Sequence, residues 1–146
     1  MDEALFKSGL SIIFRTFRNP KFNLRMEGSA NLYVQGITLM PNEIELVVDK
    51  QGYMAFKEAF AQYLVEEKED EEKQQYKMLF YISSCPIGII FYKNEELTMF
   101  ERARTGYWQG LQLPVLPLKS ARILYERINN RDKVNIIDQF FKDHPY

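Results

Sequence analysis

The stretch GSANLYVQGITLMPNEIELVVD, residues 28–49, decides the fold that we expect for this chain. It begins with a Gly-Ser pair, continues through a short helical segment, and ends in a strand that contains Glu43 and Glu45. Side chains alternate along a strand, so Glu43 and Glu45 point to one face while Ile44 points to the other. Strand geometry places the two acids roughly 6.5–7 Å apart, a spacing at which they can share or bridge divalent cations.

The Gly28-Ser29 pair supplies the second half of a candidate site. At the start of a helix, the backbone N–H groups of Gly28 and Ser29 can bind a phosphate. A phosphate site beside a metal-binding acid pair is what nucleotidyl transfer needs, because the metal activates the attacking group and neutralises the leaving pyrophosphate. Plainer interpretations stay open. Gly28 and Ser29 can be a tight turn and an N-cap, and Glu43 and Glu45 can be the solvated face of an amphipathic strand.

These residues resemble the signature of the nucleotidyltransferase superfamily, in which a Gly-Ser pair is followed by two acids that flank one apolar residue. More narrowly, the stretch resembles a family of small single-domain nucleotidyltransferase-like proteins. The positions that match that family are Gly28, Ser29, Gln35, Gly36, Glu43, Glu45 and Asp49. The tail LPVLPLKSARILYERINNRDK, residues 113–133, is also similar to the closing helices of the family.

The resemblance implies an activity, a cofactor and partners. It implies a nucleotidyltransferase that moves a nucleoside monophosphate from a metal–NTP complex to an unknown acceptor. Glu43 and Glu45 would be the catalytic acids and would hold Mg²⁺ or Mn²⁺. Small proteins of this superfamily also form one half of toxin–antitoxin pairs, which implies a protein partner.

The resemblance also implies that Gly28 and Ser29 hold the triphosphate of the nucleoside triphosphate. Basic side chains on the closing helices can reach its oxygens: Arg122, Arg127, Arg131 and Lys133. Arg131 and Lys133 match basic positions of the family's tail and are the leading nucleotide-binding candidates. Solvated helix faces or surface ion pairs explain these basic residues equally well.

Two departures from the family pattern weaken the catalytic interpretation. Active members carry Asp at both positions of the acid pair; here both are Glu, whose extra methylene fixes metal geometry less well. A third carboxylate normally comes from the later strand, here residues 87–92, which contain no acid. We expect Ile89 to face the acid pair, or Gly88 or Ile90 if the register slips by one residue. The sequence therefore predicts at most one weakly held metal ion and little or no nucleotidyl transfer. The alternative is a catalytically degenerate nucleotide-binding or protein-interaction module.

Composition favours a single domain over residues 1–146. Hydrophobic residues make up 46% of the chain, enough for a core, and the net charge of −1 gives no strong signal for nucleic-acid binding. One Cys and one His exclude a disulfide framework and a His/Cys zinc site. No apolar run reaches membrane-spanning length, and the N-terminal segment carries acids where a signal peptide needs bases. We therefore expect a cytoplasmic protein without a membrane partner.

Hydrophobic periodicity predicts the other elements. The expected helices are residues 3–18, a short helix ended by Gly36, a helix capped by Asp49, and residues 118–128 and 132–142. The expected strands are residues 22–26 and 43–48, a hairpin of residues 78–83 and 87–92, and a short edge strand at 111–113. The order helix, strand, helix, strand, helix, hairpin, helix, helix predicts an α+β fold with a small mixed sheet, helices mainly on one face and two C-terminal helices.

Three further features have functional and structural interpretations. The charge run EEKEDEEK, residues 66–73, can shield a site or repel nucleic acid, but such runs are typical of a solvated helix end or mobile loop. Tyr107 and Trp108 can stack on a base or anchor the core. Cys85 has no neighbour in the sequence that would activate it, so we interpret it as structural.

Overall fold

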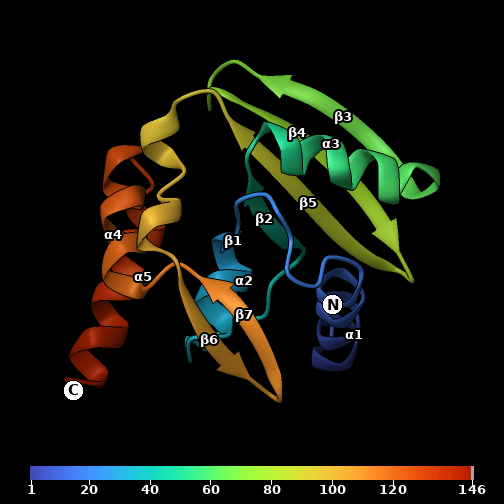
Figure 1. Ribbon diagram of the computed structural model, residues 1–146. Helices are drawn as coiled ribbons and strands as arrows, with labels where there is room; N and C mark the ends of the chain where they lie inside the picture. Colours follow the sequence, from blue (N-terminus) through green and yellow to red (C-terminus); the bar gives the residue numbers. More distant parts are fainter. Residues whose placement is uncertain (146) are drawn as a thin grey trace.

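The computed structural model describes residues 1–145 and confirms the α+β class (Figure 1). Its α-helices are α1 (Glu3–Thr16), α2 (Gly28–Tyr33), α3 (Lys50–Ala59), α4 (Leu118–Arg127) and α5 (Arg131–Asp143). The main sheet has the order β1-β2-β5-β4-β3, with strands β1 (Leu24–Glu27), β2 (Ile44–Val48), β3 (Leu64–Asp70), β4 (Gln75–Ile82) and β5 (Cys85–Tyr92). A separate hairpin joins β6 (Arg104–Trp108) to β7 (Leu111–Val115).

Strand β2 brings the parts of the candidate site together. It runs antiparallel to β1, with Glu27 opposite Glu45, and parallel to β5, with Gly88 opposite Glu45. The expected neighbour Ile89 instead pairs with Leu46, so the prediction that Ile89 faces the acid pair is wrong by one residue. The register is set by apolar residues on the buried face, and this places Gly88 on the face of the acids.

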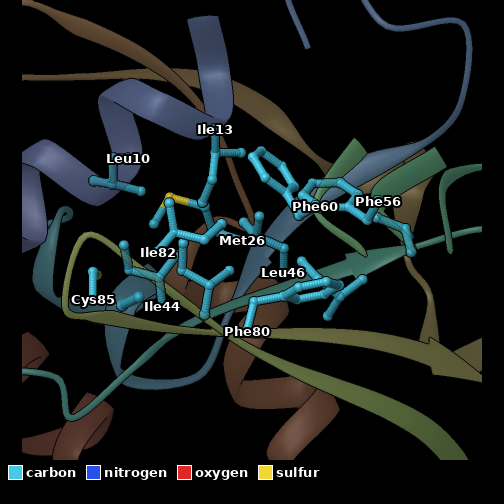
Figure 2. Packing of buried hydrophobic residues seen from close by; sticks show 14 of the residues in the cluster. Leu10, Ile13, Met26, Ile44, Leu46, Phe56, Phe60, Phe80, Ile82 and Cys85 are labelled. Atoms are coloured by element: carbon cyan, nitrogen blue, oxygen red, sulfur yellow. The ribbon is translucent and has the colours of Figure 1, made fainter. Parts of the chain in front are cut away.

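Two apolar clusters cover the two faces of the main sheet. One packs α1 and α3 against the face that carries Leu46; Figure 2 shows Leu10 of α1 and Phe56 of α3 among its members. The other packs α4 and α5 against Val47 and Ile90, which alternate onto the opposite face. In Figure 1, α3 lies in front of the sheet, α1 lies at its lower right, and α4 and α5 lie to its left. Glu45 lies on the second face, beside these C-terminal helices.

The turn from β1 into α2 corrects one expectation. Gly28 has φ +63°, in the left-handed region, which lets the chain pass directly from strand to helix. Helix α2 therefore begins at Gly28, with Glu27 in the N-cap position, and the prediction that Ser29 caps it is wrong. Asp49 does cap α3, because its Oδ1 accepts a hydrogen bond of 2.9 Å from the Gly52 backbone N–H.

The charged segment forms a strand, which the sequence analysis did not predict. Residues 66–73 were expected as a helix end or mobile loop, but most of them belong to β3, which pairs with β4 at the edge of the sheet. Charged side chains on an edge strand oppose pairing with another chain. The run therefore reflects the exposure of an edge rather than a lack of structure.

The stretch that follows β5 also contains a strand that the sequence did not predict. Residues 105–110 had no predicted element, and most of them form β6, which pairs with a β7 longer than the expected edge strand. Trp108 packs edge-on against Phe6 and Tyr33, with ring centroids 5.3 and 6.0 Å away, which confirms its role as an anchor of the core. Tyr107 is exposed.

Candidate functional site

A cleft of about 920 Å³ opens between the second face of the main sheet and the junction of α4 and α5. Its floor includes Glu27, Gly28 and Glu45. One wall is Tyr125 together with residues 127–133, and the turn at residues 72–75 lines another side. The cleft therefore brings together residues from both ends of the chain, among them the predicted Gly28, Arg131 and Lys133.

Lys133 of the cleft wall contacts Ser29, which follows the lining residue Gly28 and is not itself part of the lining. The Lys133 ammonium donates a hydrogen bond of 2.7 Å to Ser29 Oγ, so a cation of α5 contacts a hydroxyl of α2. Asn130 fixes the start of α5, because its side-chain oxygen accepts a hydrogen bond from the Lys133 backbone N–H at 3.2 Å. Arg122 lies outside the cleft lining. Its guanidinium forms a bidentate ion pair with Asp138, with Nε 2.6 Å from Oδ1 and Nη2 3.1 Å from Oδ2. Within residues 1–145, Arg122 is therefore the one basic candidate of the four that forms a surface ion pair.

A lysine that the sequence analysis did not identify joins the two acids. Lys77 of β4 donates hydrogen bonds to Glu43 Oε1 and to Glu45 Oε2, the latter at 3.2 Å. The side chain of Lys77 is only 20% exposed, so this contact is largely shielded from solvent. Gly88 gives it room: a Cβ at this position would lie 2.7 Å from Lys77 Cε and 3.0 Å from Glu43 Oε1.

The electrostatics of this group follow from burial and charge. Burial raises the pKa of the Glu45 carboxyl, Lys77 opposes the rise, and the nearby Glu43 and Glu27 add to it. Burial on its own lowers the pKa of the Lys77 ammonium, but attraction to Glu45 and Glu43 and the two hydrogen bonds outweigh this and raise it. Lys77 therefore remains a cation at neutral pH.

Glu27 is a third acid beside the pair, and the sequence analysis missed it because the first strand was expected to end one residue earlier. Its carboxylate accepts hydrogen bonds from the Tyr92 hydroxyl at 2.6 Å and from Arg25 Nη1 at 3.1 Å. Arg25 is fully buried and also donates to the Leu97 carbonyl at 3.0 Å. Removing one partner of a buried ion pair of this kind destabilises a protein by about 3–5 kcal/mol. The carboxylate of Glu27 therefore stabilises the fold.

The donor set around Glu43 and Glu45 does not fit the Mg²⁺ or Mn²⁺ that the resemblance implies. A dication would have to share the acids with the Lys77 ammonium, and like unit charges 4 Å apart repel by about 4 kcal/mol at an effective dielectric constant of 20. Gly88 offers no side-chain ligand. Within residues 1–145, no group of three or more His, Cys, Asp or Glu side chains is arranged to hold a metal ion.

The cleft wall contains a buried hydroxyl, that of Tyr125. Tyr125 is 3% exposed, and its hydroxyl makes no hydrogen bond of ordinary geometry within the described residues. Burial first, and then the charges of Glu27 and Glu45, raise the pKa of Tyr125 well above its ordinary value, while Arg25 and the nearby Gly28 N–H oppose the rise. An unsatisfied buried polar group costs about 1–3 kcal/mol, so a ligand oxygen that reached this hydroxyl would be stabilised.

The remaining matches to the family serve the fold. Gln35 Nε2 donates to the carbonyls of Asn31 and Leu116, at 3.1 and 2.8 Å, and ties α2 to the segment before α4. Gly36 has φ +106° and takes the chain out of the α2 segment, as expected.

Burial raises the pKa of the Cys85 thiol to about 11, which makes it a weak nucleophile at neutral pH.

Comparison with known proteins supports the fold. No family model and no curated protein sequence matches the chain. Among solved structures, a protein of Thermotoga maritima described as a "putative nucleotidyltransferase" superposes with a TM-score of 0.74. The match covers 98% of this chain and 96% of the other at 17% sequence identity, so it shows a shared nucleotidyltransferase-like fold alone. None of the helices between residues 1 and 145 combines the length and hydropathy needed to cross a bilayer.

Proposed function

We propose that the protein binds a nucleoside triphosphate in the cleft through its phosphate groups, without transferring the nucleotide. The hydrogen bond between Lys133 and Ser29 carries the proposal, because it places a cation and a hydroxyl together beside Gly28. Ammonium and hydroxyl groups both donate to phosphate oxygens, and hydrogen bonds from a cation to an anion are among the stronger ones. The likeness in fold to the Thermotoga maritima protein supports a nucleotide as the class of ligand.

The distribution of charge supports an anionic ligand. Arg127, Arg131 and Lys133 line one wall of the cleft, which also holds Asp132, while Glu72 lies on another side. None of the three cations forms an ion pair within the part of the chain that the structure describes. The two acids of the sheet floor are already paired: Glu27 with Arg25 and Glu45 with Lys77. An incoming phosphate can therefore bind the wall without breaking an internal ion pair.

Calorimetric titration of the protein with ATP and with adenosine tests the proposal. We expect ATP to bind and adenosine to bind at least about tenfold more weakly, since a charge-assisted hydrogen bond contributes about 1.5–3 kcal/mol and 1.4 kcal/mol is a factor of ten. Lys133→Met should weaken ATP binding by a similar factor. Lys142→Met, on the same helix but outside the cleft lining, is the matched control and should leave it unchanged.

Two outcomes would contradict the proposal. One is equal or absent binding of ATP and adenosine by the native protein, and the other is an equal loss in the Lys133 and Lys142 variants. Lys133 is a better probe than Gly28, because a Cβ at Gly28 would clash with Glu45 Oε1 and the backbone there has φ +63°. A substitution of Gly28 would disturb the fold as well as the ligand.

Nucleotidyl transfer to an acceptor is the second candidate function. The proximity of Gly28 to Glu45 favours it, because it is the arrangement that such chemistry needs. The Lys77 ammonium on the acid pair opposes it, because it contacts both carboxylates on which a metal-dependent transfer would rely. The protein partner that the resemblance implies remains a prediction.

A further inference from the structure

The cation on the acid pair is built into the chain. Lys77 projects from β4, crosses Gly88 of β5, and reaches Glu43 and Glu45 at the start of β2. Its ammonium thus contacts both carboxylates that would otherwise be available to a divalent ion. Glu45 lines the cleft, while Glu43 and Lys77 lie directly behind it. We propose that Lys77 is a tethered cation that takes the place of a divalent metal beside this cleft, so that ligand binding in the cleft is independent of metal.

The shape of the sheet supports this assignment. The residue opposite Glu45 on β5 is Gly88, and any larger residue there would meet both the Lys77 stem and the Glu43 carboxylate. The absence of a side chain at Gly88 therefore leaves the space through which Lys77 reaches the two acids. A lysine that pointed freely into solvent would need no such gap.

Charge balance supports it as well. Two carboxylates that lie side by side and mostly out of water repel each other unless a cation lies close to both. The Glu43 and Glu45 side chains are 26% and 27% exposed, so solvent screens them only in part. Lys77 supplies the compensating charge permanently, whereas a metal would do so only when bound. The nature of the ligand rests on the proposed function, but the role of Lys77 does not.

Titration with Mn²⁺ alone, without nucleotide, tests the role of Lys77 separately from nucleotide binding. Lys77→Met removes the ammonium and leaves two uncompensated carboxylates, so it should bind Mn²⁺ at least about tenfold more tightly than the native protein. Lys68→Met is the matched control, because Lys68 pairs with Lys77 across β3 and β4 but makes no contact with Glu43 or Glu45. This control should bind Mn²⁺ as weakly as the native protein.

The proposal is overturned if the native protein binds Mn²⁺ as tightly as Lys77→Met, or if Lys77→Met binds no better than Lys68→Met. Should Lys77→Met not fold, Lys77→Gln and the native protein carry the same test. In native protein, millimolar Mn²⁺ should leave the NMR amide signals of Glu45 and Gly88 sharp, and their selective paramagnetic broadening contradicts the proposal. Failure of ATP to bind would leave every one of these outcomes unaffected.

Discussion

Glu45 is a cleft residue whose charge is affected by several neighbouring charged groups. It lies opposite Glu27 on β1 and Gly88 on β5, and it accepts a hydrogen bond from Lys77 of β4. Burial disfavours its charged form more than Lys77 favours it, since the net effect is a raised pKa. Its ionisation therefore costs free energy in the folded protein, even with a cation beside it.

Because of this cost, ionisation of Glu45 lowers the free energy of unfolding as the pH rises. With a raised pKa, folded Glu45 holds its proton more tightly than the unfolded chain does. The free energy of unfolding consequently falls as pH rises from the ordinary carboxyl range through the raised pKa. Glu45→Gln removes this loss, so at pH 7 the variant should be as stable as the native protein or more stable, with the difference vanishing in acid.

Urea denaturation of native and Glu45→Gln protein between pH 4 and pH 8 measures this difference directly. A variant that is less stable than the native protein at pH 7 would show that the hydrogen bond to Lys77 outweighs the cost of burying the charge. The same variant keeps an amide oxygen that can accept from Lys77, so a large loss of structure is not expected.

At the scale of elements, the edge strand β3 carries its own prediction. Glu66 and Lys68 are exposed and lie on one face of this strand. Replacing both by Val leaves the net charge unchanged but gives a flat apolar edge, so we expect the protein to self-associate. Sedimentation velocity over a range of concentrations measures the effect.

The matched control replaces Lys119 and Glu126 of α4 by Val, which removes the same two charges from an exposed helix. This variant should remain as monodisperse as the native protein. Association of both variants to the same extent would mean that surface hydrophobicity, rather than the strand edge, is responsible.

The elements also show what the sequence could predict. Alternation located β2 and the β4–β5 hairpin, and helical spacing located α1 and the closing helices, because each pattern is a local consequence of one buried face. β3 was missed because its charges reflect its place at the sheet edge, which depends on strand order. Glu27 was missed because it is the last residue of β1, one residue beyond the expected strand. Lys77 was missed because β4 begins at Gln75, whereas alternation indicated a strand only from residue 78.

At the scale of the whole molecule, the site depends on contacts that no local pattern contains. The stretch at residues 28–49 predicted Gly28, Ser29, Glu43 and Glu45, and the structure brings them to one side of the sheet. The contact of Lys77 with the acids requires the pairing of β2, β5 and β4. The contact of Lys133 with Ser29 requires α5 to dock on the sheet through the second apolar cluster.

The central claim is that the cleft binds a nucleotide with Lys77, and not a metal, on the acid pair. A crystal structure of the protein grown with ATP and Mn²⁺, with anomalous data that locate manganese, tests it most directly. We predict phosphate density against Ser29 and Lys133, Lys77 still bonded to Glu43 and Glu45, and no manganese peak at those two acids. A manganese ion ligated by Glu43 and Glu45 with Lys77 displaced, or a cleft without ATP, would contradict the account.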